Sequence, residues 1–162
     1  LRNMYYKDEI EDKDRIVTGW GASLSGIWQF AQNTSLCFQG VYGKGISNYI
    51  QDISGTGLDL VPNATAEGKL KAFGAWGGYI GFSHNWSKVL TSNIMYSYAR
   101  VLDRYGMPTT SYKYAQYAAA NLFWDFSEYG SCAIEYVFGR RNDFNKDYGN
   151  ASRINTMIQY RF

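Results

Sequence analysis

Proline, cysteine and long apolar runs are scarce in this sequence of 162 residues. Proline occurs only at Pro62 and Pro108, so almost every backbone N–H is available for the hydrogen-bond ladder of a sheet. No run approaches the roughly 18 consecutive apolar residues that a membrane-spanning helix requires, which excludes a helical membrane protein. Transmembrane β-strands remain allowed, because they alternate apolar and polar residues and average out near neutral hydropathy.

Reactive groups and net charge are also limited. The cysteines, Cys37 and Cys132, match no metal or disulfide spacing, and we expect two small residues on strand faces. The single histidine, His84, stands in a predicted turn, where the serines beside it are ordinary turn residues. A net charge of +2 is too small to indicate binding to nucleic acid. We therefore expect no catalytic residues, no metal site and no cofactor.

Aromatic residues make up 18% of the chain, and they alternate with polar residues along most of it. Near the C-terminus, Ile154 and Tyr160 share one face of an extended strand, whereas Arg153 and Gln159 share the other. Alternation at period two predicts strands with one apolar face. The pattern predicts about eight strands, at residues 1–6, 17–30, 36–42, 70–86, 92–98, 112–126, 129–141 and 152–162.

Several of these strands hold the alternation over at least the roughly 9–11 residues that cross a bilayer when tilted. Aromatic side chains stand near the strand ends, where the interfaces of a membrane would lie; they are Trp20, Trp28, Trp76, Trp124, Tyr160 and Phe162. We therefore predict an all-β fold, an antiparallel transmembrane β-barrel, with residues 1–162 in a single domain. A large soluble β-sandwich is the alternative.

The connections between the predicted strands alternate between short and long. The short ones are residues 32–34, 85–88 and 127–128, and the long ones are residues 7–15, 43–68, 102–111 and 142–150. Outer-membrane barrels have short periplasmic turns and longer extracellular loops, so this order places Phe162 on the periplasmic side. We interpret residues 43–68 as a loop on the surface or at the mouth of a pore. Calcium needs about 6–8 oxygen ligands, and Asp52 and Asp59 in this loop do not form such a cluster.

The strand face opposite the apolar one carries most of the charges. A charge that faces lipid near the midplane costs about 2–4 kcal/mol, so we expect these side chains to line the lumen. They are the bases Arg2, Lys71, Lys113, Arg141, Arg153 and Arg161, the acids Asp125 and Glu135, and the amide of Gln159. Six bases against two acids leave four positive charges in excess, and rings of arginine or lysine select anions. We predict a water-filled pore that prefers anions; the alternative is an interior packed with ion pairs.

Short motifs resemble those of known outer-membrane proteins. The last strand ends in the aromatic Phe162 after alternating apolar residues, and so resembles the C-terminal signature that the outer-membrane assembly machinery recognises. A second resemblance, to the C-terminal half of DcaP-like porins, rests on residues 19–21, 42–52, 119–124, 133–141 and 151–154. It implies a homotrimer of larger barrels, about sixteen strands each, that passes small anionic solutes such as dicarboxylates.

This chain departs from those porins in length, because eight strands cannot enclose so wide a pore. It starts at Leu1 in a strand-like run without a signal peptide, so we expect either part of a longer barrel or a small closed one. The first predicts an outer-membrane porin of a Gram-negative bacterium, in contact with membrane lipid and small anionic solutes. The second predicts an eight-stranded barrel with a structural, adhesive or loop-binding role. A lipid-modifying enzyme would need a partner for His84, so we expect no enzyme.

Overall fold

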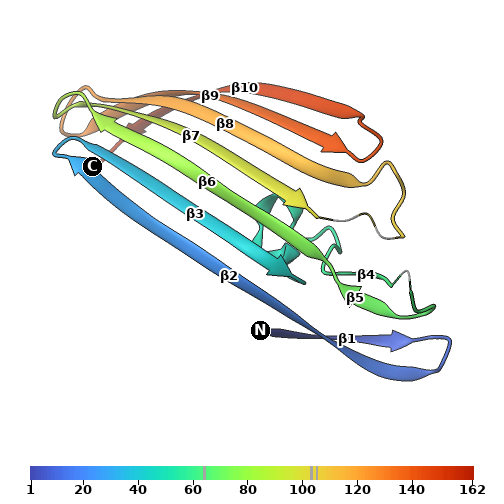
Figure 1. The fold of residues 1–162 in the computed structure, drawn as a ribbon. Coiled ribbons are helices and arrows are strands. Elements are labelled where there is room, and N and C mark those ends of the chain that lie inside the picture. Colours follow the sequence, from blue (N-terminus) through green and yellow to red (C-terminus); the bar gives the residue numbers. More distant parts are fainter. Residues whose placement is uncertain (64, 103, 105) are drawn as a thin grey trace.

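A single curved antiparallel sheet dominates the computed structural model, which describes residues 1–63, 65–102, 104 and 106–162 (Figure 1). Its eight strands run in the order β1-β2-β3-β6-β7-β8-β9-β10. Because β1 and β10 are its edges, the sheet is not closed in this chain. The predicted all-β fold with eight main strands is confirmed. The strands are β1 (Arg2–Asp8), β2 (Lys13–Ala31), β3 (Thr34–Lys44), β6 (Gly74–Asn85), β7 (Leu90–Val101), β8 (Tyr112–Asp125), β9 (Gly130–Asp143) and β10 (Tyr148–Tyr160).

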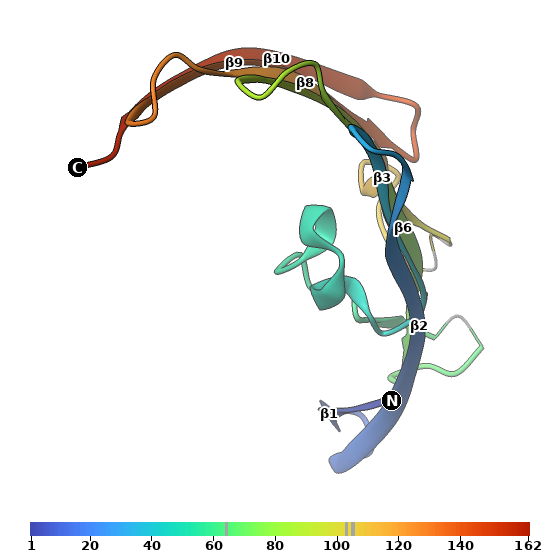
Figure 2. The same cartoon turned by 90° about the vertical axis from the view of Figure 1, so that its left-hand side faces the viewer.

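The segment between β3 and β6 leaves the sheet. It contains two short 3-10 turns, η1 (Ser47–Tyr49) and η2 (Gln51–Ile53), and a small separate sheet of β4 (Leu60–Pro62) and β5 (Leu70–Ala72). The two 3-10 turns lie on the concave side of the curved sheet (Figure 2). None of the helical turns in the described part of the chain is long and apolar enough to cross a membrane.

The strand register gives each face of the main sheet its own set of residues. Val41 pairs with Gly77, Gly77 with Ala99, and Ala99 with Ala115, so odd-numbered residues line up across four strands. The buried isoleucines of the inserted segment pack against this row, which places odd-numbered residues of the regular ladder on the concave face, outside the register shifts at residues 29–31 and 112–114. Even-numbered residues therefore point to the convex face.

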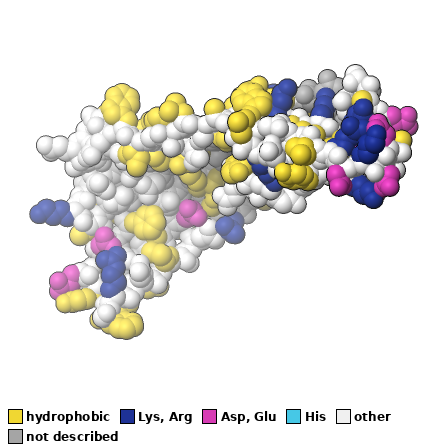
Figure 3. Space-filling view, turned by 90° about the horizontal axis from the view of Figure 1, so that it is seen from below, with side chains coloured by type: hydrophobic (Ala, Val, Ile, Leu, Met, Phe, Trp, Pro, Cys, Tyr) yellow, Lys and Arg dark blue, Asp and Glu magenta, His cyan; other side chains and the backbone are white. Residues whose placement is uncertain are grey.

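Two predicted long loops are wrong, because most of their residues continue the strands. Residues 7–15 form a hairpin in which Asp8 pairs with Lys13, and residues 142–150 form one in which Tyr148 pairs with Asn142. The apolar alternation stops there because both faces are polar, so the sequence pattern of a half-buried strand is absent although the ladder continues. Ion pairs from Arg15 to Asp8 and Glu11 stabilise the first hairpin, at the end where many charged side chains gather (Figure 3).

The remaining connections follow the predicted alternation. Three short turns, at residues 32–33, 86–89 and 126–129, lie at the same end of the sheet as the C-terminus (Figure 1). The connections of residues 45–73 and 102–111 are long and lie at the opposite end. The predicted strand 70–86 is interrupted at Phe73, whose buried N–H donates to the Asp59 carbonyl, so that β5 and β6 belong to different sheets.

Candidate functional site

The concave face carries an inserted loop, which we define as residues 45–59. Ile46, Ile50 and Ile53 point from this loop to the wall and are buried, with Ile53 at 0% exposure. Burying a side chain of this size contributes about 1.5–3 kcal/mol, so the loop has its own apolar attachment to the sheet. Its partners in the cluster are Val61, Phe73, Ala75, Ala99, Val101 and Tyr112.

The carboxylate of Asp59 ties the base of the inserted loop together. Its Oδ1 accepts hydrogen bonds from the N–H and the hydroxyl of Ser47, both at 2.8 Å, and its Oδ2 accepts one from Arg2 Nη1 at 2.7 Å. Burial alone would raise the pKa of Asp59, but these hydrogen bonds and the charge of Arg2 outweigh it and hold the pKa below its usual value. Arg2 thus connects β1 to the inserted loop.

Two grooves flank the inserted loop on the concave face. One, of about 290 Å³, runs between the loop and β1, β2 and β3, and the other, of about 270 Å³, runs between the loop and β3, β6 and β7. Tyr49 borders both grooves and is 67% exposed. The loop therefore narrows the space in front of the wall and presents an aromatic hydroxyl to it.

A line of hydrogen-bonded polar side chains crosses the concave face of β7, β8, β9 and β10. Asn93 Nδ2 donates to Asn121 Oδ1 at 2.8 Å, and Asn121 Nδ2 lies 3.4 Å from Glu135 Oε2. Asn155 Nδ2 donates to Glu135 Oε1 at 2.9 Å from the other side. A carboxylate offers about four lone-pair positions, so Glu135 is held in place and still has acceptor capacity toward the concave space.

The charged residues predicted to line a lumen have different surroundings. Arg141, Arg153, Gln159, Asp125 and Glu135 lie at odd-numbered positions on the concave side of β8, β9 and β10. Arg161 follows β10, and its backbone N–H donates to the Tyr129 carbonyl. Two of the bases are already paired: Arg2 with Asp59, and Arg141 Nε with Asp143 Oδ1 at 2.9 Å.

Two of the predicted lysines lie outside the regular ladder of the main sheet. Lys71 lies in β5 and pairs with Val61 in the small sheet, because the chain leaves the main sheet at Phe73. Lys113 lies in a register shift between Tyr112 and Tyr114, where an extra residue breaks the alternation. Tyr112 takes the inward place and donates its hydroxyl to the Ala99 carbonyl. The predicted excess of positive charge on this wall stays a prediction.

The convex face carries two rows of aromatic side chains. Near the long connections, the rings of Trp20 and Tyr42 lie 5.7 Å apart, those of Trp76 and Tyr98 5.0 Å, and Tyr114 stacks on Tyr98 at 5.5 Å. Near the short turns, the second row comprises Trp28, Phe30, Phe82, Trp124, Phe126, Tyr129 and Tyr160. Phe162 follows the end of β10 and is fully exposed.

An uncharged apolar band separates the two rows. Its large side chains are exposed, as Leu24, Ile94, Ile134 and Ile154 illustrate with 52–71% of their surface accessible. None of the convex positions between the rows, all of which the structure describes, carries a lysine, arginine, aspartate or glutamate. An exposed apolar surface of this extent indicates contact with an apolar environment.

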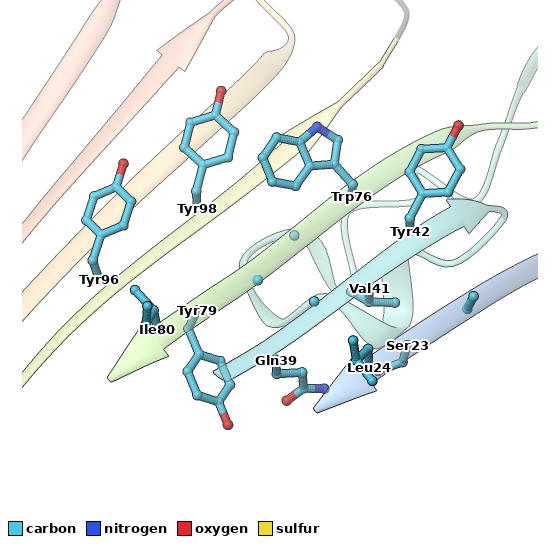
Figure 4. A pocket seen from close by; sticks show the side chains of 14 residues that line it. Ser23, Leu24, Gln39, Val41, Tyr42, Trp76, Tyr79, Ile80, Tyr96 and Tyr98 are labelled. Atoms are coloured by element: carbon cyan, nitrogen blue, oxygen red, sulfur yellow. The ribbon is translucent and has the colours of Figure 1, made fainter. Parts of the chain in front are cut away.

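A hollow of about 760 Å³ interrupts this band where Gly40 of β3 pairs with Gly78 of β6 (Figure 4). A Cβ placed on Gly40 would meet nothing within 4 Å, so the hollow exists because this position lacks a side chain. Side chains from β2, β3, β6 and β7 surround it, among them Leu24, Tyr42, Trp76, Ile80, Tyr96 and Tyr98.

Sequence reasoning placed residues 43–68 in a loop but did not predict the attachment of this loop to the concave face, and it missed the polar line. In the loop, Ile46, Ile50 and Ile53 are spaced by four and three residues, the apolar period of a helical turn, which is a signal for an attachment to a core. The amides at Asn93 and Asn121 gave no comparable signal, because their alignment with Glu135 depends on the register between separate hairpins.

Comparisons with known proteins give a match in structure only. No family model matches the sequence, and no curated protein matches it significantly. The fold is similar to the crystal structure of the outer membrane channel DcaP of Acinetobacter baumannii, with a TM-score of 0.75 and 19% sequence identity. The similarity covers 99% of this chain and 45% of the channel, so the chain spans less than half of the channel's length. The resemblance to half of such a porin is confirmed at the level of the fold.

Proposed function

We propose that this chain forms part of the wall of an outer-membrane barrel through which small polar solutes diffuse. The observation that carries the proposal is the contrast between the faces of one curved sheet. The convex face carries an uncharged apolar band between its two aromatic rows, and the concave face is polar and holds the inserted loop. A barrel in lipid has this arrangement, with apolar residues outward and polar residues toward the lumen. The similarity to an outer membrane channel supports a porin-like role rather than an enzymatic one.

In this proposal the two aromatic rows lie at the two membrane interfaces. Trp20 and Trp76 belong to the row on the side of the long connections, and Trp28, Trp124 and Tyr160 belong to the row on the side of the short turns. Indole and phenol rings favour this depth because they combine an apolar body with a polar edge. The long connections then face outward, and the C-terminus with Phe162 faces the periplasm.

The inserted loop would narrow the pore in this arrangement. It occupies the inner side of the wall, is fixed by buried isoleucines and the Asp59 contacts, and leaves a groove on either side. A preference for anions is part of the proposal, and it now rests on Arg153 and Arg161. Both are exposed, whereas Arg2 and Arg141 are paired with carboxylates. We expect this preference to be weak, since Asp125 and Glu135 lie on the same wall.

The assembly that completes the pore is also part of the proposal. Since the sheet has two open edges, further strands must close the barrel, and we propose a homotrimer of such barrels in a Gram-negative outer membrane. The C-terminal strand with its terminal Phe162 would be the segment that the assembly machinery binds. The alternative of a self-contained eight-stranded barrel is less well supported, because β1 and β10 do not pair with each other.

Single-channel conductance in a planar bilayer under a salt gradient tests the proposed function. The protein in its full length should give stepwise openings, in groups of three for a trimer, with a reversal potential of anion-selective sign. Folded protein that inserts into the bilayer but does not conduct would contradict the pore. Such a result would support a structural or binding role instead.

A further inference from the structure

The hollow around Gly40 has the features of a site for a hydrocarbon chain. It lies on the convex face, inside the apolar band, and it adjoins the aromatic row on the side of the long connections. Gly40 and Gly78 form its floor, and its rim consists of aliphatic and aromatic side chains (Figure 4). Its volume of about 760 Å³ lies within the range of roughly 300–1,000 Å³ that is typical of ligand sites.

Cations flank this hollow at one end only. Lys44 lies two residues beyond Tyr42 on β3, and Arg100 lies two residues beyond Tyr98 on β7, so both stand on the side of the long connections. Trp76 on β6 pairs with Arg100 and separates the two cations, whose strands are about 10 Å apart. Lys44 is exposed, and the Nε atom of Arg100 is buried without a hydrogen-bond partner among the residues that the structure describes.

We propose that this part of the convex face binds a phosphorylated glycolipid of the outer leaflet. One acyl chain fills the hollow over Gly40 and Gly78, and phosphate groups of the head lie against Lys44 and Arg100. Each charge near a membrane surface attracts anionic lipid by about 1 kcal/mol, and each buried methylene adds about 0.8 kcal/mol. The inference rests on the proposed function, since it requires the long connections to face the outer leaflet.

A lipid fits the distribution of charge better than a second copy of this face does. The convex positions around the hollow, all of them in the described part of the chain, carry no carboxylate, so the same face of another copy would bring further cations toward Lys44 and Arg100. An anionic lipid has one charged end and one apolar end. The charged end of the lipid matches the cations beyond the aromatic row, and its apolar end matches the uncharged hollow on the other side of that row.

Native mass spectrometry of the full-length protein tests this site. The protein is incubated with diphosphorylated lipid A or with phosphatidylcholine, and the retained lipid is counted for each oligomer. Gly40→Leu places a side chain in the hollow, and the Cβ atom at this position meets no atom within 4 Å. We expect it to lower lipid A retention about tenfold, the effect of excluding about two methylenes from the site. Lys44→Gln and Arg100→Gln should each lower it about fivefold.

Ala120→Leu is the matched control, since Ala120 is an exposed convex residue outside the hollow. It enlarges the same face by a similar amount and should leave retention unchanged. Equal retention by Gly40→Leu and Ala120→Leu would overturn the site, as would equal retention of lipid A and phosphatidylcholine. Loss of the oligomer in Gly40→Leu with lipid binding intact would make the hollow a subunit contact. Conductance of the same samples separates the two proposals, because channels that conduct but retain no lipid A refute only the lipid site.

Discussion

The concave and convex faces of this sheet are built from alternate residues of the same strands, yet they differ in the polar groups that they carry and in the contacts of these groups. On the concave face, the polar groups are joined to one another: Asn121 and Asn155 hold Glu135, and Asp59 joins Arg2 to the inserted loop. Among the described strand residues of the convex face, arginine and lysine stand only toward the long connections, and the band between the aromatic rows is uncharged. Hydrogen bonds thus connect the polar side chains of the concave face, whereas the middle of the convex face has few side chains that require hydrogen-bond partners.

This difference follows from the solvent that each face would meet. A polar group facing hydrocarbon finds no water to bond, so any charge in the middle of the convex face is costly. Water and neighbouring side chains can solvate the concave face, so charges persist there. The comparison predicts that chemically identical substitutions will have unequal effects on adjacent residues.

The largest effect is expected from a charge placed on the convex face. Ile134→Arg puts a guanidinium inside the apolar band, where it should lower the free energy of unfolding by up to about 2–4 kcal/mol, the cost at the midplane. Ala133→Arg places the same group on the concave face of the same strand and should cost less than about 1 kcal/mol. Denaturant unfolding of the protein in lipid vesicles measures both.

The unchanged protein and Ala133→Leu are the references for that pair, since leucine adds bulk at the concave position without charge. Equal losses for Ile134→Arg and Ala133→Arg would mean that both faces are solvated alike. The convex band would then not be the surface that meets lipid.

The division of each strand into an apolar and a polar face could be predicted from the sequence, but the ends of the strands could not. Alternation of apolar and polar residues identified all eight main strands, because one solvated face and one apolar face produce a period of two. It failed beyond the aromatic rows, where the Asp8–Lys13 and Asn142–Tyr148 pairs continue the ladder with polar residues on both sides. It also failed at Tyr112, where one extra residue interrupts the alternation and puts an even-numbered residue on the concave face.

A smaller loss of stability is expected from changes at Asp59. This residue tests whether polar contacts hold the inserted loop on the concave face. The pKa of Asp59 is lowered from its ordinary value of 3.8, so its contribution is complete above that pH and is lost as the pH falls through the lowered pKa. We expect the inserted loop to become accessible to an acid-stable protease only below about pH 3.8. Asp59→Asn should weaken the attachment by about 1–2 kcal/mol at neutral pH and remove the acid response of the loop.

Asp8 provides an internal control for this experiment. Burial raises the pKa of its carboxyl, but hydrogen bonds from the Glu11 and Ile10 amides and from Arg15 outweigh that effect, so the pKa is also lowered. Its contacts stabilise the β1–β2 hairpin rather than the inserted loop. Asp59→Asn should therefore leave acid-induced cleavage of the hairpin unchanged. An inserted loop that still opens with acid in Asp59→Asn would show that another group controls it.

Of the candidate site, only the positions of strand residues on the concave face could be predicted from the sequence. The concave positions of Arg153 and Glu135 follow from alternation, whereas the pairing of Arg2 with Asp59 joins residues 57 positions apart in the sequence. No local pattern fixes such a contact, because it depends on how residues 45–73 fold back over the sheet. The sequence-based count of lumen charges did not include Asp59 and Asp143, which pair with Arg2 and Arg141 in the structure.

The smallest effect is expected on ion selectivity, when a single cationic side chain is removed. The test is whether the effect differs between a cation of the concave face and one of the convex face. Arg153 on the concave side is exposed and lies two residue pairs along the ladder from Glu135, while Arg140 on the convex side lies 4.4 Å above the ring of Tyr148. In a water-filled pore one charge is screened, so Arg153→Ala should lower the ratio of anion to cation permeability by only about twofold. Arg140→Ala removes the same charge from the opposite face and should leave that ratio unchanged. Reversal potentials under a salt gradient measure the permeability ratio of both variants. Equal shifts would mean that selectivity depends on the total charge of the protein and not on the face that carries it. The concave surface would then not be the lining of the pore.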